Sequence, residues 1–292
     1  MEEIIVTKSN VTVYKNWREN ICCEDKNNKA LTEKAGLKRE RYHRGEAKGC
    51  SRFGSRNSED ALSWSVFRTL QLRNSMNLFY ELGGIKDSLQ TTIFWTRDTK
   101  TGNCDKDLVR IINLIEPKSL WRIQQTEPDV ILKGMSRLFF IEAKLGKQGA
   151  KISAWARKKD FERKGKQFRY RDKGFLDGLF TQDFIDDFRR EGKRFYQLMR
   201  NYVIGNKLAE AWKLDFQLCA LVNRLNCAKN GNSHEQEFGK FKKYLLNKNK
   251  AHILTWQDML GLIDKDERLI ELAEWMRNYP YLDLLTESHT FE

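Results

Sequence analysis

Two carboxylates and a lysine flank two apolar runs, and these are the residues of the chain best suited to chemistry. Asp129 precedes the run at residues 130–132, while Glu142 and Lys144 follow the run at residues 138–141. Carboxylate oxygens suit Mg²⁺, which binds through one or two of them together with substrate phosphate oxygens. A lysine beside such a cation can orient or deprotonate a water molecule, or stabilise charge on a phosphate. These residue types indicate metal-assisted hydrolysis of a phosphodiester.

A β-hairpin would bring these side chains together. Residues 133–136, which include Gly134, separate the two apolar runs, and this pattern predicts a buried hairpin. Asp129 then falls opposite Glu142 or its neighbours, and Glu142 and Lys144 share one face because strand side chains alternate. Buried acids must be paired or bind a cation. The alternative is a surface hairpin whose charges form an ion pair of little energetic value.

Pro128-Asp129, twelve intervening residues and then Glu142-Ala143-Lys144 resemble the motif of the PD-(D/E)XK nuclease superfamily. The resemblance implies the restriction-endonuclease-like fold, an α/β fold with a mixed central β-sheet flanked by helices. It also implies that Asp129, Glu142 and the backbone carbonyl of Ala143 hold Mg²⁺, with Mn²⁺ as a substitute. Lys144 would position or activate the attacking water.

A helix start upstream offers a third carboxylate. Asn57-Ser58-Glu59-Asp60 predicts the beginning of a helix, since Asn or Ser caps helices and acids favour the first turn. The apolar spacing that follows places Glu59 on the buried stripe, and Asp60 can also face inward. Nucleases of the resembled superfamily often carry a glutamate on this helix, which implies Glu59 first and Asp60 second as a catalytic metal ligand. An acid favoured only by the helix dipole is the alternative.

Positive charge is concentrated directly after the motif. The whole chain carries a net charge of +13, and residues 144–173 alone hold twelve basic and three acidic residues. Basic side chains near phosphates release counterions on binding, so this segment is predicted to contact nucleic acid. A solvated amphipathic helix is the alternative. The predicted contacts in this segment are Lys147, Lys151, Arg157, Lys158, Arg163 and Lys164.

A later helical region, residues 184–212, is predicted to contribute Gln197 and Arg200 to nucleic-acid binding. Its sequence Gln197-Leu-Met-Arg-Asn201-Tyr202 is similar to a Gln-and-Tyr helix motif of some superfamily members, although the tyrosine comes one residue late. Gln197 and Asn201 share a helix face and could assist at the site. They are equally compatible with ordinary exposed polar positions.

The elements around the hairpin are those of a mixed α/β sheet. Strands are expected at residues 89–95, 216–222 and 252–255, with helices at 234–246 and 256–263 between and after the last two. Helices that alternate with strands allow parallel crossovers. We expect residues 1–56 to form a basic N-terminal arm or subdomain. Residues 57–292 would form the nuclease-like domain, with a basic insertion at residues 145–180.

Composition narrows the class of protein further. The chain of 292 residues is 40% hydrophobic and contains no apolar run of about 18 residues, which excludes a spanning helix. Its N-terminus lacks a secretory h-region, and its six cysteines form no C-x-x-C pair. We therefore expect a cytoplasmic protein with reduced cysteines, acting away from membranes.

The sequence thus predicts a Mg²⁺-dependent DNA endonuclease, of restriction type because no helicase or methylase motif is evident. Double-stranded DNA is the expected partner, and cleavage of both strands of a palindrome would suggest a homodimer by analogy with symmetric enzymes. Two alternatives stay open. One is a non-catalytic basic nucleic-acid-binding protein, and the other is a repair, recombination or RNA-directed nuclease of the same fold.

Overall fold

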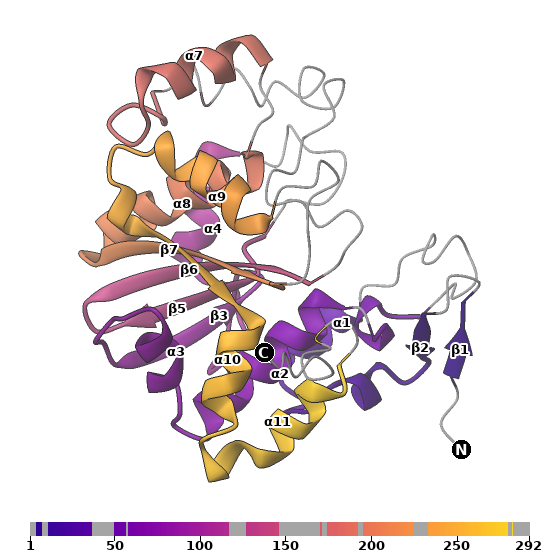
Figure 1. Ribbon diagram of the computed structural model, residues 1–292. Coiled ribbons are helices and arrows are strands. Elements are labelled where there is room, and N and C mark those ends of the chain that lie inside the picture. Colours follow the sequence, from indigo (N-terminus) through magenta and orange to yellow (C-terminus); the bar gives the residue numbers. More distant parts are fainter. Residues whose placement is uncertain are drawn as a thin grey trace, which may run out of the picture. The chain divides into compact units, whose positions relative to one another are not determined.

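The computed structural model describes residues 4–7, 11–36, 50–56, 58–116, 127–145, 170, 174–191, 195–224, 233–279 and 282 (Figure 1). The strands are β1 (Ile4–Val6), β2 (Thr12–Tyr14), β3 (Leu89–Phe94), β4 (Arg97–Asp98), β5 (Val130–Gly134), β6 (Arg137–Lys144), β7 (Asp215–Val222) and β8 (Ala251–Thr255). The α-helices are α1 (Lys29–Ala35), α2 (Glu59–Leu72), α3 (Asn77–Leu82), α4 (Lys106–Ile115), α7 (Gln182–Glu191), α8 (Tyr196–Trp212), α9 (His234–Lys243), α10 (Trp256–Ile263) and α11 (Ile270–Arg277). Short 3-10 helices are η1 (Trp17–Asn20), η3 (Arg52–Gly54), η5 (Lys248–Lys250) and η6 (Glu267–Leu269).

The chain divides into two compact units. The first unit combines Met1–Lys86, Thr99–Asn103 and Leu254–Glu292, and the second combines Asp87–Asp98 and Cys104–Ile253. Both ends of the chain therefore contribute to the first unit, while the second is built from the middle. The domain boundary predicted at residue 57 stays a prediction.

A six-stranded sheet with the order β4-β3-β5-β6-β7-β8 runs through the described residues. β3, β5 and β6 pair antiparallel in turn, and β6 pairs parallel with β7. The parallel step needs a crossover, and α8 supplies its helix between β6 and β7. The predicted fold class, α/β with a mixed central sheet flanked by helices, is confirmed.

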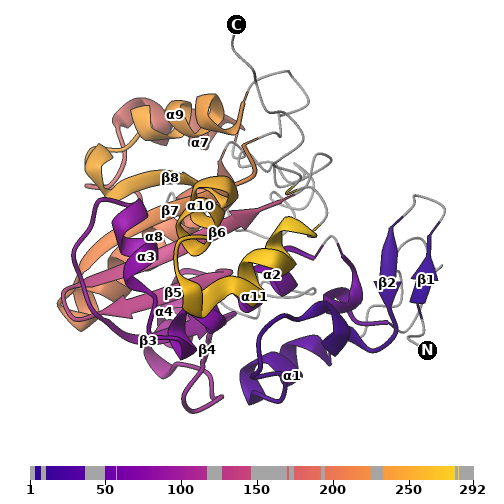
Figure 2. The same ribbon diagram turned by 60° about the horizontal axis from the view of Figure 1, so that its bottom comes forward.

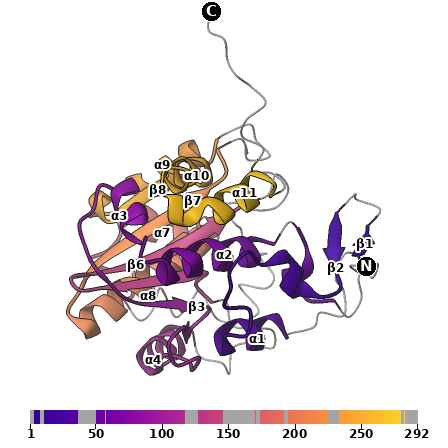
Figure 3. The same cartoon turned by 90° about the horizontal axis from the view of Figure 1, so that it is seen from below.

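Helices α4 and α8 lie on the same side of the strands in the second unit (Figures 1 and 3). Apolar side chains of α4, α7, α8 and α9 join those from one face of the sheet in a single core. Residues on the other face of β5, β6 and β7, such as Val130, Phe139 and Leu221, are buried as well. Continuous apolar runs are the pattern of strands buried on both faces, which is why the sequence shows little alternation here.

The first unit contains the predicted helix start. Ser58 caps α2, and its hydroxyl accepts a hydrogen bond from the Ala61 backbone N–H at 3.1 Å. α2 then begins at Glu59 and buries residues that include Leu62 and Val66. α11 lies beside α10 in Figure 2 and also contacts α2. The helix expected from the capping signal is therefore confirmed.

A close approach between α8 and β7 holds the crossover against the sheet. Gly205 of α8 faces the Phe216 ring of β7, and a Cβ at this position would overlap the ring. The ring is buried and packs edge-on against Tyr202 and Phe140. Glycine is required here because a side chain would overlap the Phe216 ring. Its backbone conformation is ordinary helix and makes no such demand.

We expect Gly205→Ala to lower the free energy of unfolding by about 1–3 kcal/mol, because it overpacks the contact with Phe216. Urea denaturation measures this change. Gly239→Ala in α9 is the matched control, because a Cβ there meets nothing within 4 Å. Alanine's better helix propensity should raise stability by about 0.5–1 kcal/mol at that site. Equal stability of Gly205→Ala and the wild-type protein would contradict the packing described.

Candidate active site

The β5–β6 hairpin brings the predicted acids into register. Val130 pairs with Ile141 at the open end of the hairpin, so Asp129 directly precedes the last pair on one strand and Glu142 directly follows it on the other. The Ala143 N–H donates to Asp129 Oδ2 at 2.9 Å and ties the start of β5 to the end of β6. The expected hairpin and its facing acids are therefore present in the structure.

Asp87 holds the turn of this hairpin, a role that sequence reasoning missed. Its carboxylate accepts hydrogen bonds from the backbone N–H groups of Met135 at 3.2 Å, Ser136 at 3.3 Å and Arg137 at 2.9 Å. A carboxylate that accepts several turn amides fixes the turn geometry. Because the turn sets the register of a hairpin, Asp87 helps to place Asp129 against Glu142.

The Lys144 ammonium lies among three oxygen-bearing groups. Nζ is 2.6 Å from Glu142 Oε1 and 2.9 Å from the Ala143 carbonyl oxygen. It is also 4.0 Å from Asp129 Oδ2. Glu142 is 2% exposed and Lys144 is 7% exposed, so this ion pair is buried. The groups predicted to hold a metal ion thus surround one positive charge, which the chain itself provides.

Asn201 of α8 binds the second oxygen of Glu142. Its Nδ2 donates to Glu142 Oε2 at 2.7 Å. Its Oδ1 accepts from Arg200 Nε at 3.2 Å and Nη2 at 2.8 Å. Asn201 and Arg200 are both 0% exposed. Of the two roles left open for Asn201, assistance at the site agrees with this contact.

A second buried carboxylate lies behind Arg200. Glu116, which follows α4, accepts hydrogen bonds from the hydroxyls of Tyr170 at 3.0 Å and Tyr196. Burial, together with the charge of Glu116, raises the pKa of both tyrosines well above its ordinary value. They therefore act as protonated donors. Burial opposes the charge of Arg200, but the carboxylates of Glu116 and Glu142 outweigh it and raise the guanidinium pKa.

The structure places the other predicted residues as follows. Gln197 is half-buried on α8, one turn before Asn201. Arg200 was predicted to contact nucleic acid, but its side chain is enclosed and its guanidinium binds Asn201 instead. A fully enclosed group has no surface to offer a phosphate. The remaining predicted contacts lie outside the described residues: Lys147, Lys151, Arg157, Lys158, Arg163 and Lys164.

Glu59 and Asp60 belong to the first unit. Glu59 is half-buried in the first turn of α2, and Asp60 is buried with its Oδ2 3.7 Å from Arg52 Nη1. The Asp60 contact agrees with a structural role in its own unit. A part for either acid in metal binding stays a prediction.

His234 is a further buried group that sequence reasoning did not single out. It is the first residue of α9 and is 4% exposed. Burial and the nearby charge of Lys144 lower the pKa of the imidazole below its usual value. This shift favours the neutral imidazole beside Lys144.

The donor set at the hairpin fits a hard divalent cation. Asp129, Glu142 and the Ala143 carbonyl offer only oxygen atoms, the ligands that Mg²⁺ prefers. They already converge on the Lys144 ammonium. Among the described residues, no group of three or more His, Cys, Asp or Glu side chains could hold a metal ion.

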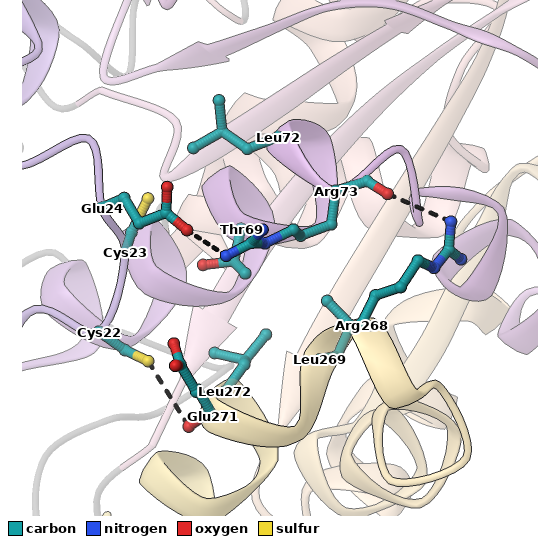
Figure 4. Close-up of a pocket in the computed structure, with 10 residues that line it drawn as sticks. All are labelled: Cys22, Cys23, Glu24, Thr69, Leu72, Arg73, Arg268, Leu269, Glu271 and Leu272. Atoms are coloured by element: carbon teal, nitrogen blue, oxygen red, sulfur yellow. Dashed lines mark hydrogen bonds and ion pairs between the residues drawn. The ribbon is translucent and has the colours of Figure 1, made fainter.

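The first unit contains a small cavity that is separate from the hairpin residues (Figure 4). It is lined by residues that include Cys22, Arg73 and Arg268, and its volume is about 20 Å³. Such a volume holds about one water molecule. Burial, first of all, raises the pKa of Cys22 to about 12, so its thiol is not a ready nucleophile. The cavity is too small for a substrate and lacks an activated group.

The chain matches a known protein family over nearly its whole length. The family described as "Restriction Endonuclease associating with ARP" matches residues 3–279. The chain belongs to this family. Neither the curated proteins nor the solved structures that were compared gave a match.

Membership of this family agrees with the predicted restriction-endonuclease-like nuclease. The match covers both compact units, not only the hairpin. In the described residues, no helix combines the length and apolar character needed to cross a bilayer.

We expect Lys144→Met to lower the free energy of unfolding by about 3 kcal/mol in EDTA, because Glu142 then stays buried without its counter-charge. Urea denaturation measures the loss. Adding Glu142→Gln should recover part of it, since the unpaired charge is removed. Lys133→Met is the control on the same hairpin. Its ammonium lies 4.2 Å from the Trp212 ring centroid, a contact worth about 1 kcal/mol. Equal losses at both lysines would contradict a buried ion pair.

Proposed function

We propose that the protein is a Mg²⁺-dependent DNA endonuclease of restriction type, with a PD-(D/E)XK active site at the open end of the β5–β6 hairpin. One observation carries the proposal: Asp129, Glu142 and the Ala143 carbonyl converge on a single cation, the Lys144 ammonium. The family match supports nuclease activity and DNA as the substrate.

Metal binding and positioning of the attacking water would fall to different residues of the chain. Asp129, Glu142 and the Ala143 carbonyl would hold Mg²⁺, and Mn²⁺ would substitute for it. Bound Mg²⁺ supplies Lewis-acid polarisation of the phosphate and lowers the pKa of a bound water. Lys144 must then leave the oxygens that it now contacts. Its ammonium is placed to orient the attacking water or to stabilise charge on the phosphate.

The partner that we propose is double-stranded DNA. The net charge of +13 favours a polyanion, and the basic segment at residues 144–173 follows the last strand of the hairpin in sequence. A homodimer would suit symmetric cleavage of a palindrome, by analogy with symmetric enzymes. A role for Glu59 as a third metal ligand belongs to the same proposal.

We expect Asp129→Ala to reduce plasmid cleavage in Mg²⁺ by about 100-fold or more, because the site loses a ligand oxygen. Gel assays of supercoiled plasmid give the rate, and circular dichroism checks folding. Asp183→Ala, an exposed acid in the first turn of α7, is the control and should cut like the wild-type protein.

Parallel reactions with single-stranded DNA and single-stranded RNA identify the preferred nucleic acid, and Ca²⁺ and EDTA test metal dependence. Wild-type rates in Asp129→Ala would refute the site assignment. DNA binding without cleavage by the wild-type protein, across varied plasmids in Mg²⁺ and Mn²⁺, would favour a non-catalytic binding protein.

Lys144→Met should bind Mn²⁺ more tightly than the wild-type protein while losing cleavage. The lysine ammonium competes with the metal for the same oxygens, and removal of about 1.4 kcal/mol of competition gives about tenfold tighter binding. Isothermal titration calorimetry measures the affinity. Weaker Mn²⁺ binding in Lys144→Met would show that lysine and metal do not share these oxygens.

A further inference from the structure

The amide of Asn201 makes two contacts that depend on each other. Its oxygen accepts two hydrogen bonds from Arg200, and its nitrogen donates to Glu142 Oε2. A guanidinium carries only donors, so the side of the amide that faces Arg200 must be its oxygen. The NH₂ group is then turned to the carboxylate. With the amide reversed, two acceptors would face each other at Glu142.

The two oxygens of Glu142 therefore have different partners. Oε2 is occupied by Asn201, and Oε1 lies 2.6 Å from the Lys144 ammonium. Oε1 is therefore the oxygen that shares the Lys144 ammonium with Asp129 and the Ala143 carbonyl. A carboxylate held by one oxygen cannot rotate without losing that hydrogen bond.

We propose that Arg200 is a positioning residue, which orients Glu142 for cation binding by holding the Asn201 amide. The inference rests on the proposed function, because it takes the hairpin oxygens as the cation site. Partners behind metal ligands commonly set ligand orientation, and their loss weakens metal binding or activity by about 10- to 100-fold.

Glu116 supplies the counter-charge that allows Arg200 to be buried behind Asn201. A buried guanidinium needs a counter-charge, and Glu116 supplies one from the end of α4. Arg200 Nη1 and Glu116 Oε2 find no hydrogen-bond partner in the described part of the chain, although their charges attract. Tyr170 and Tyr196 bind the other oxygen of Glu116. Glu116 thus supplies the larger part of the counter-charge of Arg200 from outside the bonds that Arg200 makes to Asn201.

This separation allows folding and positioning to be tested apart. Arg200→Lys keeps the positive charge near Glu116, but an ammonium cannot reproduce the fixed guanidinium fork. We expect a folded protein with about 10-fold weaker Mn²⁺ binding in calorimetry and a similarly raised Mg²⁺ requirement for cleavage. Wild-type values for Arg200→Lys would mean that the arginine supplies charge alone, and would overturn the proposal.

A second pair of variants covers the case in which loss of the arginine prevents folding. Arg200→Met strands the buried Glu116 charge, and Glu116→Gln in the same chain removes that charge. We expect the double variant to regain a melting temperature close to the wild-type value while its Mn²⁺ binding stays about 10- to 100-fold weak. Recovery of both properties would assign Arg200 a merely structural role.

Asn201→Ala tests the link between Arg200 and Glu142. We expect it to weaken Mn²⁺ binding about 10- to 100-fold, and Arg200→Lys should add no further loss once the amide is gone. Asn206→Ala is the control on the same helix, because its amide donates to the Tyr202 carbonyl at 2.7 Å instead. Fully additive losses in the double variant would contradict action through Asn201.

The two proposals fail in different ways. If the wild-type protein cuts no nucleic acid in Mg²⁺ or Mn²⁺, the proposed function is wrong, and Mn²⁺ binding still decides the positioning role. Weaker binding by Asn201→Ala and Arg200→Lys supports that role. Equal binding by these variants, or no Mn²⁺ binding by the wild-type protein, overturns it.

Discussion

The buried charge of Glu142 is the constraint on which the site depends. An uncompensated carboxylate in the interior costs several kcal/mol, so both of its oxygens need partners. Lys144 contacts one oxygen from the same face of β6, and Asn201 reaches the other from α8. One side chain thereby links two elements that are distant in sequence. The end of β6 and the middle of α8 must lie together for both oxygens of the acid to have partners.

Helix α8 meets this demand because it is buried over much of its length. Its residues from Leu198 to Gly205 have little or no exposure, including Arg200 and Asn201. Adjacent helix residues point about 100° apart, so two neighbouring polar side chains can both be enclosed only in a helix covered on several sides. The sheet and α4 cover α8, and the close contact at Gly205 brings it near β7.

The hairpin and its facing acids could be predicted because their signals are local. Two apolar runs, a glycine turn and the period of two in a strand suffice to bring Asp129 and Glu142 to the same end of the hairpin. The interior position of Arg200 could not be predicted in this way. A basic residue on an amphipathic helix is usually exposed, and the charge that keeps this one inside comes from Glu116, far upstream. The same limit applies to Asp87 at the turn. Its partners are backbone amides in a segment distant in sequence, and no local residue pattern predicts such contacts.

The balance of charge among the buried groups around Glu142 gives a reason for the interior position of Arg200. Asp129, Glu142 and Glu116 bring three carboxylates, while Lys144 and Arg200 bring two positive charges, which leaves one negative charge in excess. A divalent cation at the proposed site would turn this into one positive charge, suited to a phosphodiester. Without Arg200 the same groups would carry two negative charges before cation binding, and Glu142 and Glu116 would both lose a favourable neighbour. An interior arginine therefore supplies a counter-charge to these acids and keeps the net charge of the group small in either state.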